Sequence, residues 1–234
     1  MKNPSLTQEY FMCVVNEKGR TVPSALVVNH STITVCLIVS GVSELLKNEY
    51  LTLDQTQAPT LPTGLKQLAD AASLTINKPL GEDFAYLKPI YDFIADSKEP
   101  VGIKNIALAF YSEYSTKHLD KLLSAMGEFL MKTGYADELP AQGFLNKKIR
   151  YAPKVEFVDS IIHKIRTEFL NNDSVSEEVL SLAALLDKST VINAYFDKKE
   201  SDAFKERIKE VRNSTKYTLL KDVKRINDLL DGPF

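Results

Sequence analysis

After residue 102 the chain places apolar side chains at helical spacing almost throughout, and this periodicity constrains the fold more than any other feature. Apolar residues recur there every three or four positions, as on the buried face of an amphipathic helix. The pattern predicts helices over residues 103–110, 116–133, 159–170, 175–187, 200–212 and 218–230. A chain built mostly from such segments folds as a mainly α protein.

Local signals place some of the boundaries in this half. Ser174 and Glu177 stand at capping-box spacing at the start of one helix, where each side chain binds the other's backbone N–H. Gly134 follows the helix at 116–133 and is expected to end it, because glycine readily adopts the left-handed conformation common at helix C-termini. Residues 135–151 then predict a β-hairpin.

The N-terminal region predicts two helices. The first covers residues 6–16, with Ser5 and Gln8 at capping-box spacing. Residues 24–39 are rich in β-branched side chains, which favour a strand, but sixteen residues without a turn signal are too long for one. We therefore expect a buried helix that continues through a break near Gly41 to residue 46.

Residues 50–100 have a mixed pattern. Alternation of apolar and polar residues predicts short strands at 50–53 and 74–76, and residues 65–72 are expected to form a helical segment. Residues 83–95 predict an amphipathic helix with a kink or a late start at Pro89, because proline removes an internal hydrogen bond.

The composition suits a globular protein. The 234 residues are 44% hydrophobic and 26% charged, with a net charge of -2, which excludes general disorder. No repeat or composition shift divides the chain, so we expect one domain over residues 1–234. There is no signal-peptide pattern, and the longest apolar-rich stretch, residues 35–42, is far shorter than the ~20 residues of a membrane span. We therefore expect a cytoplasmic protein.

The sequence contains no phosphate-binding loop, nucleophile elbow or metal-binding motif. Cys13 and Cys36 lie in apolar surroundings and are expected to be small buried hydrophobes in a reducing compartment. The acidic pairs at 82–83 and 177–178 stand at predicted helix starts, where they complement the helix dipole. Three isolated histidines could act as a base beside a cysteine, but partly exposed histidines without a catalytic role are the simpler interpretation: His30, His118 and His163. We expect no enzymatic activity, no metal and no cofactor.

Charge is unevenly distributed along the chain. Residues 147–166 carry six basic and two acidic side chains, whereas residues 41–100 carry five basic and nine acidic ones. In the predicted hairpin an apolar pair stands directly before a basic cluster: Phe144, Leu145, Lys147, Lys148 and Arg150. An exposed apolar pair beside cations can enter the interface of a bilayer while the cations attract anionic lipid headgroups. These five residues are our candidate lipid-binding site.

The order of elements resembles the Golgi phosphoprotein family. The similar stretches are residues 6–11 followed by Gly19, a helix running into a strand at 36–53, a helix, glycine and hairpin over 122–153, and the closing segments 180–187 and 204–211. The resemblance implies a four-helix core ringed by amphipathic helices, a projecting hairpin, and no catalysis. It also implies a peripheral membrane module that binds a phosphoinositide-type anionic phospholipid.

The phosphoinositide pocket of that family is not matched. The family pattern has a tryptophan and three arginines, and this chain has no tryptophan and places Ala25, Thr34, Asp120 and Leu123 at those positions. An aspartate repels a phosphate, and the nearby Lys117 and Lys121 lack the bidentate fork of arginine. General contact with anionic lipid through the hairpin is therefore the expectation.

Two other interpretations stay open. The helix at 116–133 with its hairpin could be part of a winged-helix DNA-binding unit, with Lys147, Lys148 and Arg150 on phosphates. Alternatively the hairpin could be buried in a homo-oligomer or against a partner protein, with no lipid role. The slightly negative net charge makes nucleic acid the weaker alternative.

Overall fold

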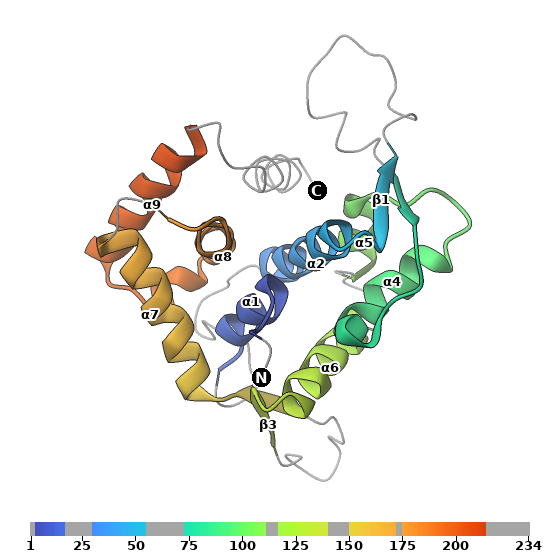
Figure 1. Cartoon of the computed structure of the whole chain (residues 1–234), viewed down its shortest axis with the longest axis horizontal. Helices are drawn as coiled ribbons and strands as arrows, with labels where there is room; N and C mark the ends of the chain where they lie inside the picture. The colour runs from blue at the N-terminus through green and yellow to red at the C-terminus, as the bar shows by residue number, and fades with distance from the viewer. Residues whose placement is uncertain are drawn as a thin grey trace. The chain divides into compact units, whose positions relative to one another are not determined.

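The computed structural model describes residues 3–16, 30–54, 73–110, 117–139, 150–171 and 175–213. Over these residues the chain forms eight α-helices, two short 3-10 helices and two antiparallel two-stranded sheets (Figure 1). The predicted mainly α class with a β-hairpin is confirmed. None of the described helices is both long and apolar enough to cross a membrane.

The chain divides into two compact units. One contains residues 1–33 and 130–223, and the other contains residues 34–129 and 224–234. The assignment of residues 1–234 to one domain stays a prediction, as does the four-helix arrangement implied by the family resemblance. The helical segments predicted at 65–72 and 218–230 lie outside the described residues.

The first unit begins with α1 (Leu6–Val14), whose capping box is confirmed. The backbone N–H of Gln8 donates to Ser5 Oγ at 3.3 Å, and the backbone N–H of Ser5 donates to Gln8 Oε1 at 3.0 Å. Seven of the nine residues of α1 are buried, so the helix is enclosed on nearly every side.

The rest of the first unit is built around α8 (Glu177–Lys188), in which Val179 to Leu186 are all buried. It packs against α1, α7 (Val155–Asn171) and α9 (Lys198–Asn213), and Figure 1 shows α9 to its upper left and α7 to its lower left. A short 3-10 helix, η2 (Val191–Ala194), connects α8 to α9. A helix buried all round needs several partners, and these three provide them.

Two boundaries in the first unit differ from the prediction. The N-cap of α8 is Ser176, which accepts a hydrogen bond from the backbone N–H of Val179 at 3.4 Å, and not Ser174, which lies outside the described residues. Helix α7 begins at Val155, four residues earlier than predicted, because the carbonyl of Lys154 accepts from the N–H of Phe157 at 3.1 Å.

The second unit contains most of α2 (His30–Lys47), and the predicted break at Gly41 is wrong. The helix is continuous there despite its β-branched residues, because burial of nearly its whole circumference outweighs propensity. Glycine serves packing instead. A Cβ at position 41 would lie 2.9 Å from Ile90 Cδ1 and 3.0 Å from Leu87 Cδ2.

The remaining elements of the second unit follow the predicted order. Strands β1 (Leu51–Asp54) and β2 (Ser73–Ile76) pair antiparallel. The predicted interruption at Pro89 is confirmed as a late start, since the 3-10 helix η1 (Glu82–Leu87) precedes α4 (Lys88–Ala95), with proline in the first turn of α4. The unit is completed by α5 (Ile103–Phe110) and by most of α6 (Lys117–Lys132).

The contact at Gly41 predicts a graded response to substitution. Gly41→Val should lower the free energy of unfolding by about 2 kcal/mol, because its branched side chain overlaps the buried ends of Leu87 and Ile90. Gly41→Ala should change it by less than about 1 kcal/mol, since the gain in helix propensity offsets part of the crowding. Urea unfolding of both variants measures the difference. Equal effects would show that packing at this position is loose.

Candidate functional site

The predicted hairpin is present and its two arms are in register. Strands β3 (Ala136–Leu139) and β4 (Arg150–Pro153) pair antiparallel from Ala136 opposite Pro153 to Leu139 opposite Arg150. Gly134, with a φ of 84°, turns the chain from α6 into β3, as its position predicted. Residues 140–149 therefore connect the strands beyond the pair Leu139–Arg150.

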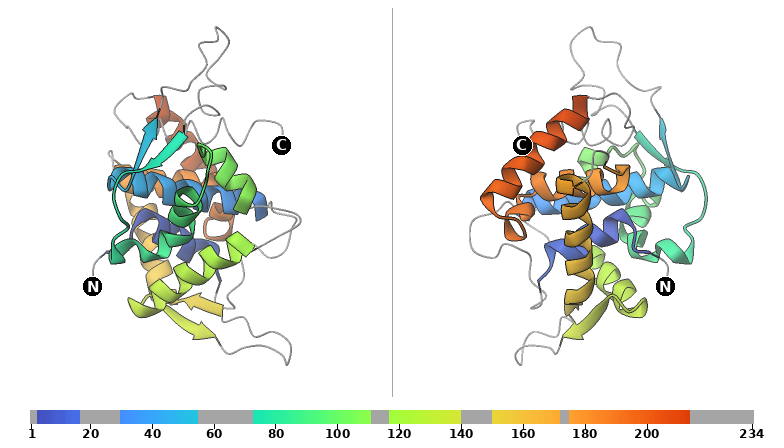
Figure 2. Two further views of the ribbon diagram at one scale, coloured as in Figure 1. Left: turned by 90° about the vertical axis from the view of Figure 1, so that its right-hand side faces the viewer. Right: turned by 60° about the vertical axis from the view of Figure 1, so that its left-hand side comes forward.

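The hairpin is attached to the N-terminal end of α7 (Figure 2). The ring of Tyr135 packs edge-on against Phe157 of α7 with centroids 4.6 Å apart. The backbone N–H of Lys154 donates to the carbonyl of Tyr135 at 3.0 Å, and Tyr151 of β4 is buried. These contacts hold the hairpin against the start of α7, so the paired strands are fixed relative to that helix.

Of the five predicted lipid-binding residues, the structure describes only Arg150, which is half-buried at the last strand pair. Phe144, Leu145, Lys147 and Lys148 lie outside the described residues. That the five residues form one surface therefore stays a prediction.

The described part of the hairpin and of the helix that follows is more acidic than basic at its surface. Asp137, Glu138, Glu156 and Asp159 are exposed, whereas Arg150 and Lys154 are half-buried, and the Lys154 ammonium lies 3.8 Å from a carboxylate oxygen of Asp137. An exposed lysine, Lys164, lies further along α7.

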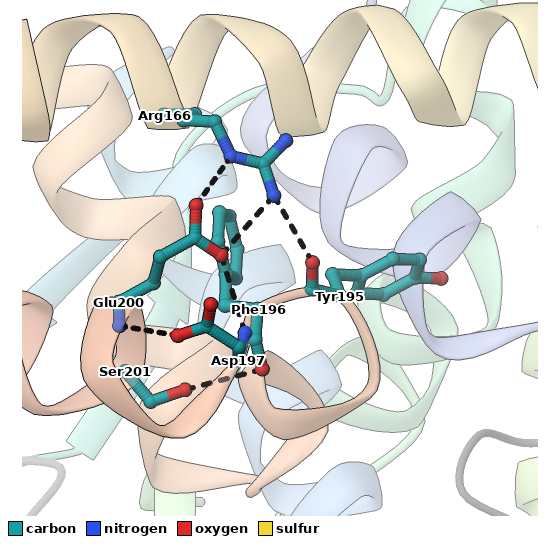
Figure 3. Close-up of polar contacts among 6 residues, drawn as sticks. All are labelled: Arg166, Tyr195, Phe196, Asp197, Glu200 and Ser201. Carbon is teal, nitrogen blue, oxygen red and sulfur yellow. Dashed lines mark hydrogen bonds and ion pairs between the residues drawn. The ribbon is translucent and has the colours of Figure 1, made fainter.

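Arg166 of α7, which the sequence analysis counted with the basic residues, is engaged inside the first unit (Figure 3). Its Nε donates to Glu200 Oε1 at 2.8 Å, and its Nη2 donates to the carbonyl of Tyr195 at 3.3 Å. The guanidinium also stacks over the ring of Phe196, 5.0 Å from its centroid. One side chain thus joins α7 to the turn before α9.

This contact has electrostatic consequences. The hydrogen bond from Arg166 lowers the pKa of Glu200, and the same bond raises the pKa of Arg166. Glu200 is also bound locally, since its backbone N–H donates to Asp197 Oδ1 at 2.8 Å. Both Arg166 and Glu200 therefore stay charged and paired at neutral pH. Their role is to position the turn that Tyr195 and Phe196 occupy.

The first unit contains one acid that sequence reasoning missed. Glu9 is the one charged residue of α1 and is half-buried. Burial raises its pKa to about 7, with Lys164 of α7 lowering it and Glu178 of α8 raising it further. The sequence signal for Glu9 is a single charge on an otherwise uncharged helix. The two charges that act on it come from helices far away in the sequence.

The cysteines and histidines do not form a nucleophilic pair among the described residues. Cys13 and Cys36 are buried and form no disulfide, as predicted, and burial together with Glu9 raises the pKa of the Cys13 thiol. A thiol in that state is a poor nucleophile. The ring of His118 lies against Phe93 and Phe110, with centroids 5.4 and 5.3 Å apart.

The other two histidines and the acidic pairs show no catalytic arrangement among the described residues. His163 is exposed on α7, and the side chain of His30 lies outside the described residues. Glu82 and Glu177 begin η1 and α8, where their charge favours the helix dipole. Within the described residues no group of three or more His, Cys, Asp or Glu side chains is arranged to hold a metal ion.

Comparison of the sequence with protein-family models and with curated proteins finds no match in either. The similarity to the Golgi phosphoprotein family therefore stays a prediction from sequence pattern.

The Arg166 contact predicts a measurable loss on a conservative change. Arg166→Lys should lower the free energy of unfolding by about 1 kcal/mol, because lysine keeps the charge but cannot bind Glu200 and the Tyr195 carbonyl together. The matched control is Lys88→Met, which breaks the exposed pair with Asp92 and should cost under about 0.5 kcal/mol.

The Arg166–Glu200 pair also predicts how the free energy of unfolding depends on pH. Because the folded-state pKa of Glu200 is lowered, the stability it contributes is present above the ordinary carboxyl range and is lost as pH falls through that range. The difference between the native chain and Glu200→Gln, measured by urea unfolding, should therefore shrink on acidification. A difference that stayed constant with pH would contradict a charged contact.

Proposed function

We propose that this protein is a non-enzymatic peripheral membrane protein that binds anionic phospholipid through the segment joining β3 and β4. The observation that carries the proposal is the anchored hairpin: two strands in fixed register, held to α7, carry a connecting segment that contains Phe144, Leu145, Lys147 and Lys148.

The chemistry of that segment supports this function over the others. An aromatic and an aliphatic side chain next to each other can be buried at the boundary between headgroups and acyl chains. Each lysine near an anionic surface adds roughly 1 kcal/mol of attraction. The exposed acids of the hairpin arms, Asp137 and Glu138, oppose binding by the arms themselves and so restrict contact to the connecting segment.

The same acids argue against the DNA-binding alternative. The hairpin of a winged-helix protein needs basic side chains along its strands to contact DNA phosphates. The described arms of this hairpin present exposed carboxylates there. The oligomer alternative uses the same apolar pair and is distinguished by experiment.

Co-sedimentation with vesicles tests the proposal. The native protein should bind phosphatidylcholine vesicles that contain about one-fifth phosphatidylserine, and binding should weaken as salt is raised because the attraction is electrostatic. Phe144→Ser combined with Lys147→Glu should weaken binding at least about tenfold, since both the apolar contact and a cation are lost. Vesicles with phosphatidylinositol 4-phosphate in place of phosphatidylserine test for a headgroup preference.

The matched control makes the same two chemical changes elsewhere. Leu108→Ser with Lys205→Glu alters an exposed leucine and an exposed lysine of the described surface, and should leave binding unchanged. If the native protein fails to bind any anionic vesicle, or if the hairpin variant binds equally well, the proposal is wrong. A change of oligomeric state in the hairpin variant would then favour the self-association alternative.

A further inference from the structure

Helix α1 is the most enclosed short element of the first unit and also contains two unfavourable polar groups. The Thr7 hydroxyl is fully buried and has no hydrogen-bond partner among the described residues. Two residues later, Glu9 brings a carboxyl group into a partly buried position on the same helix. Both groups lower the stability of the packed state relative to a state in which α1 is open to water.

The rest of α1 holds it in place. Its capping box, formed by Ser5 and Gln8, binds the backbone N–H groups of these two residues, so Glu9 does not serve as the cap. At the other end, the hydroxyl of Tyr195 donates to the carbonyl of Cys13 at 2.7 Å. The helix packs against α7 and α8 through its buried residues. Opening of α1 would therefore expose the Cys13 side chain, which is completely buried when the helix is packed.

We propose that α1 is a proton-controlled clasp: it packs firmly between α7 and α8 when Glu9 is protonated, and opens more often when Glu9 is ionised. The charged group that faces Glu9 from α7 is Lys164, the one from α8 is Glu178, and Cys13 lies one turn along α1 itself. Burial of the carboxylate has the largest effect on its pKa, ahead of the cation, which lowers it, and the anion, which raises it.

The sign follows from proton linkage. The pKa of Glu9 is about 7 in the packed helix, and an open helix restores the ordinary value of 4.5. The packed state therefore binds the proton more tightly, and its advantage is complete below the ordinary value and is lost as pH rises toward 7. With these two pKa values of Glu9, proton linkage predicts that the equilibrium constant for opening of α1 rises about tenfold between pH 6 and pH 8 and then levels off.

Thiol labelling of the full-length protein measures this opening. The chain is labelled with iodoacetamide at a series of pH values, and Cys13 and Cys36 are followed separately by peptide mass spectrometry. Each rate is divided by that of the urea-unfolded chain at the same pH, which removes the ordinary pH dependence of thiol reactivity. The ratio for Cys13 should rise about tenfold from pH 6 to pH 8.

Variants separate the clasp from general destabilisation. Glu9→Gln should make the Cys13 ratio independent of pH over this range. Thr7→Val, which removes the unpartnered hydroxyl without a change in shape, should lower the ratio at every pH by the same factor and leave the pH dependence intact. Glu178→Gln should move the midpoint of the rise to lower pH, because Glu178 raises the pKa of Glu9.

Cys36 is the internal control. It is fully buried in α2 and belongs to the second unit, so its ratio should not follow Glu9. If Cys36 rises with Cys13, the opening is global unfolding and the clasp is wrong. The proposal also fails if the Cys13 ratio is the same at pH 6 and pH 8, or if Glu9→Gln keeps the rise.

Discussion

The burial of eight consecutive residues of α8, Val179 to Leu186, is the constraint on which the first unit depends. A helix segment with no solvent-facing side must be covered by other helices, and α1, α7 and α9 cover it. Apolar burial is not directional, so it does not by itself decide how the covering helices are oriented. Directional contacts do this at a few points, chiefly the Arg166 fork on Glu200 and Tyr195 and the hydroxyl of Tyr195 on the Cys13 carbonyl. Tyr195 takes part in both, which couples the end of α1 to the turn before α9.

Much of this fold is predictable from sequence, and the reasons are local. The capping box of α1, the turn at Gly134 and the late start at Pro89 each depend on residues within one turn of the chain, and all three are confirmed. Helix α2 shows the opposite case. Gly41 lies inside it against Leu87 and Ile90, which are more than forty residues away in the sequence. A glycine that makes room for a neighbour and a glycine that breaks a helix look identical in a linear pattern.

The candidate sites show the same difference between features set by neighbouring residues and features set by distant ones. Sequence reasoning can find the apolar and basic residues between β3 and β4 because they are consecutive, yet it counts Arg166 as available when that side chain is already bound. It also overlooks Glu9, whose pKa is raised chiefly by burial, with Lys164 and Glu178 on two other helices acting on it as well. Counting charges along a chain treats each as free and fully solvated. The fold determines which of these charges are paired. It also determines which are buried, where the loss of solvation disfavours the ionised form and shifts the pKa.

The paired arms of the β3–β4 hairpin have an evolutionary consequence. Their register and their packing on α7 are complete without the residues that connect them, so a change in the length or composition of that connection need not disturb the frame. Connections between paired strands accept insertion and replacement more readily than helices in a core. Selection can therefore alter this connection while the helices around α8 stay unchanged.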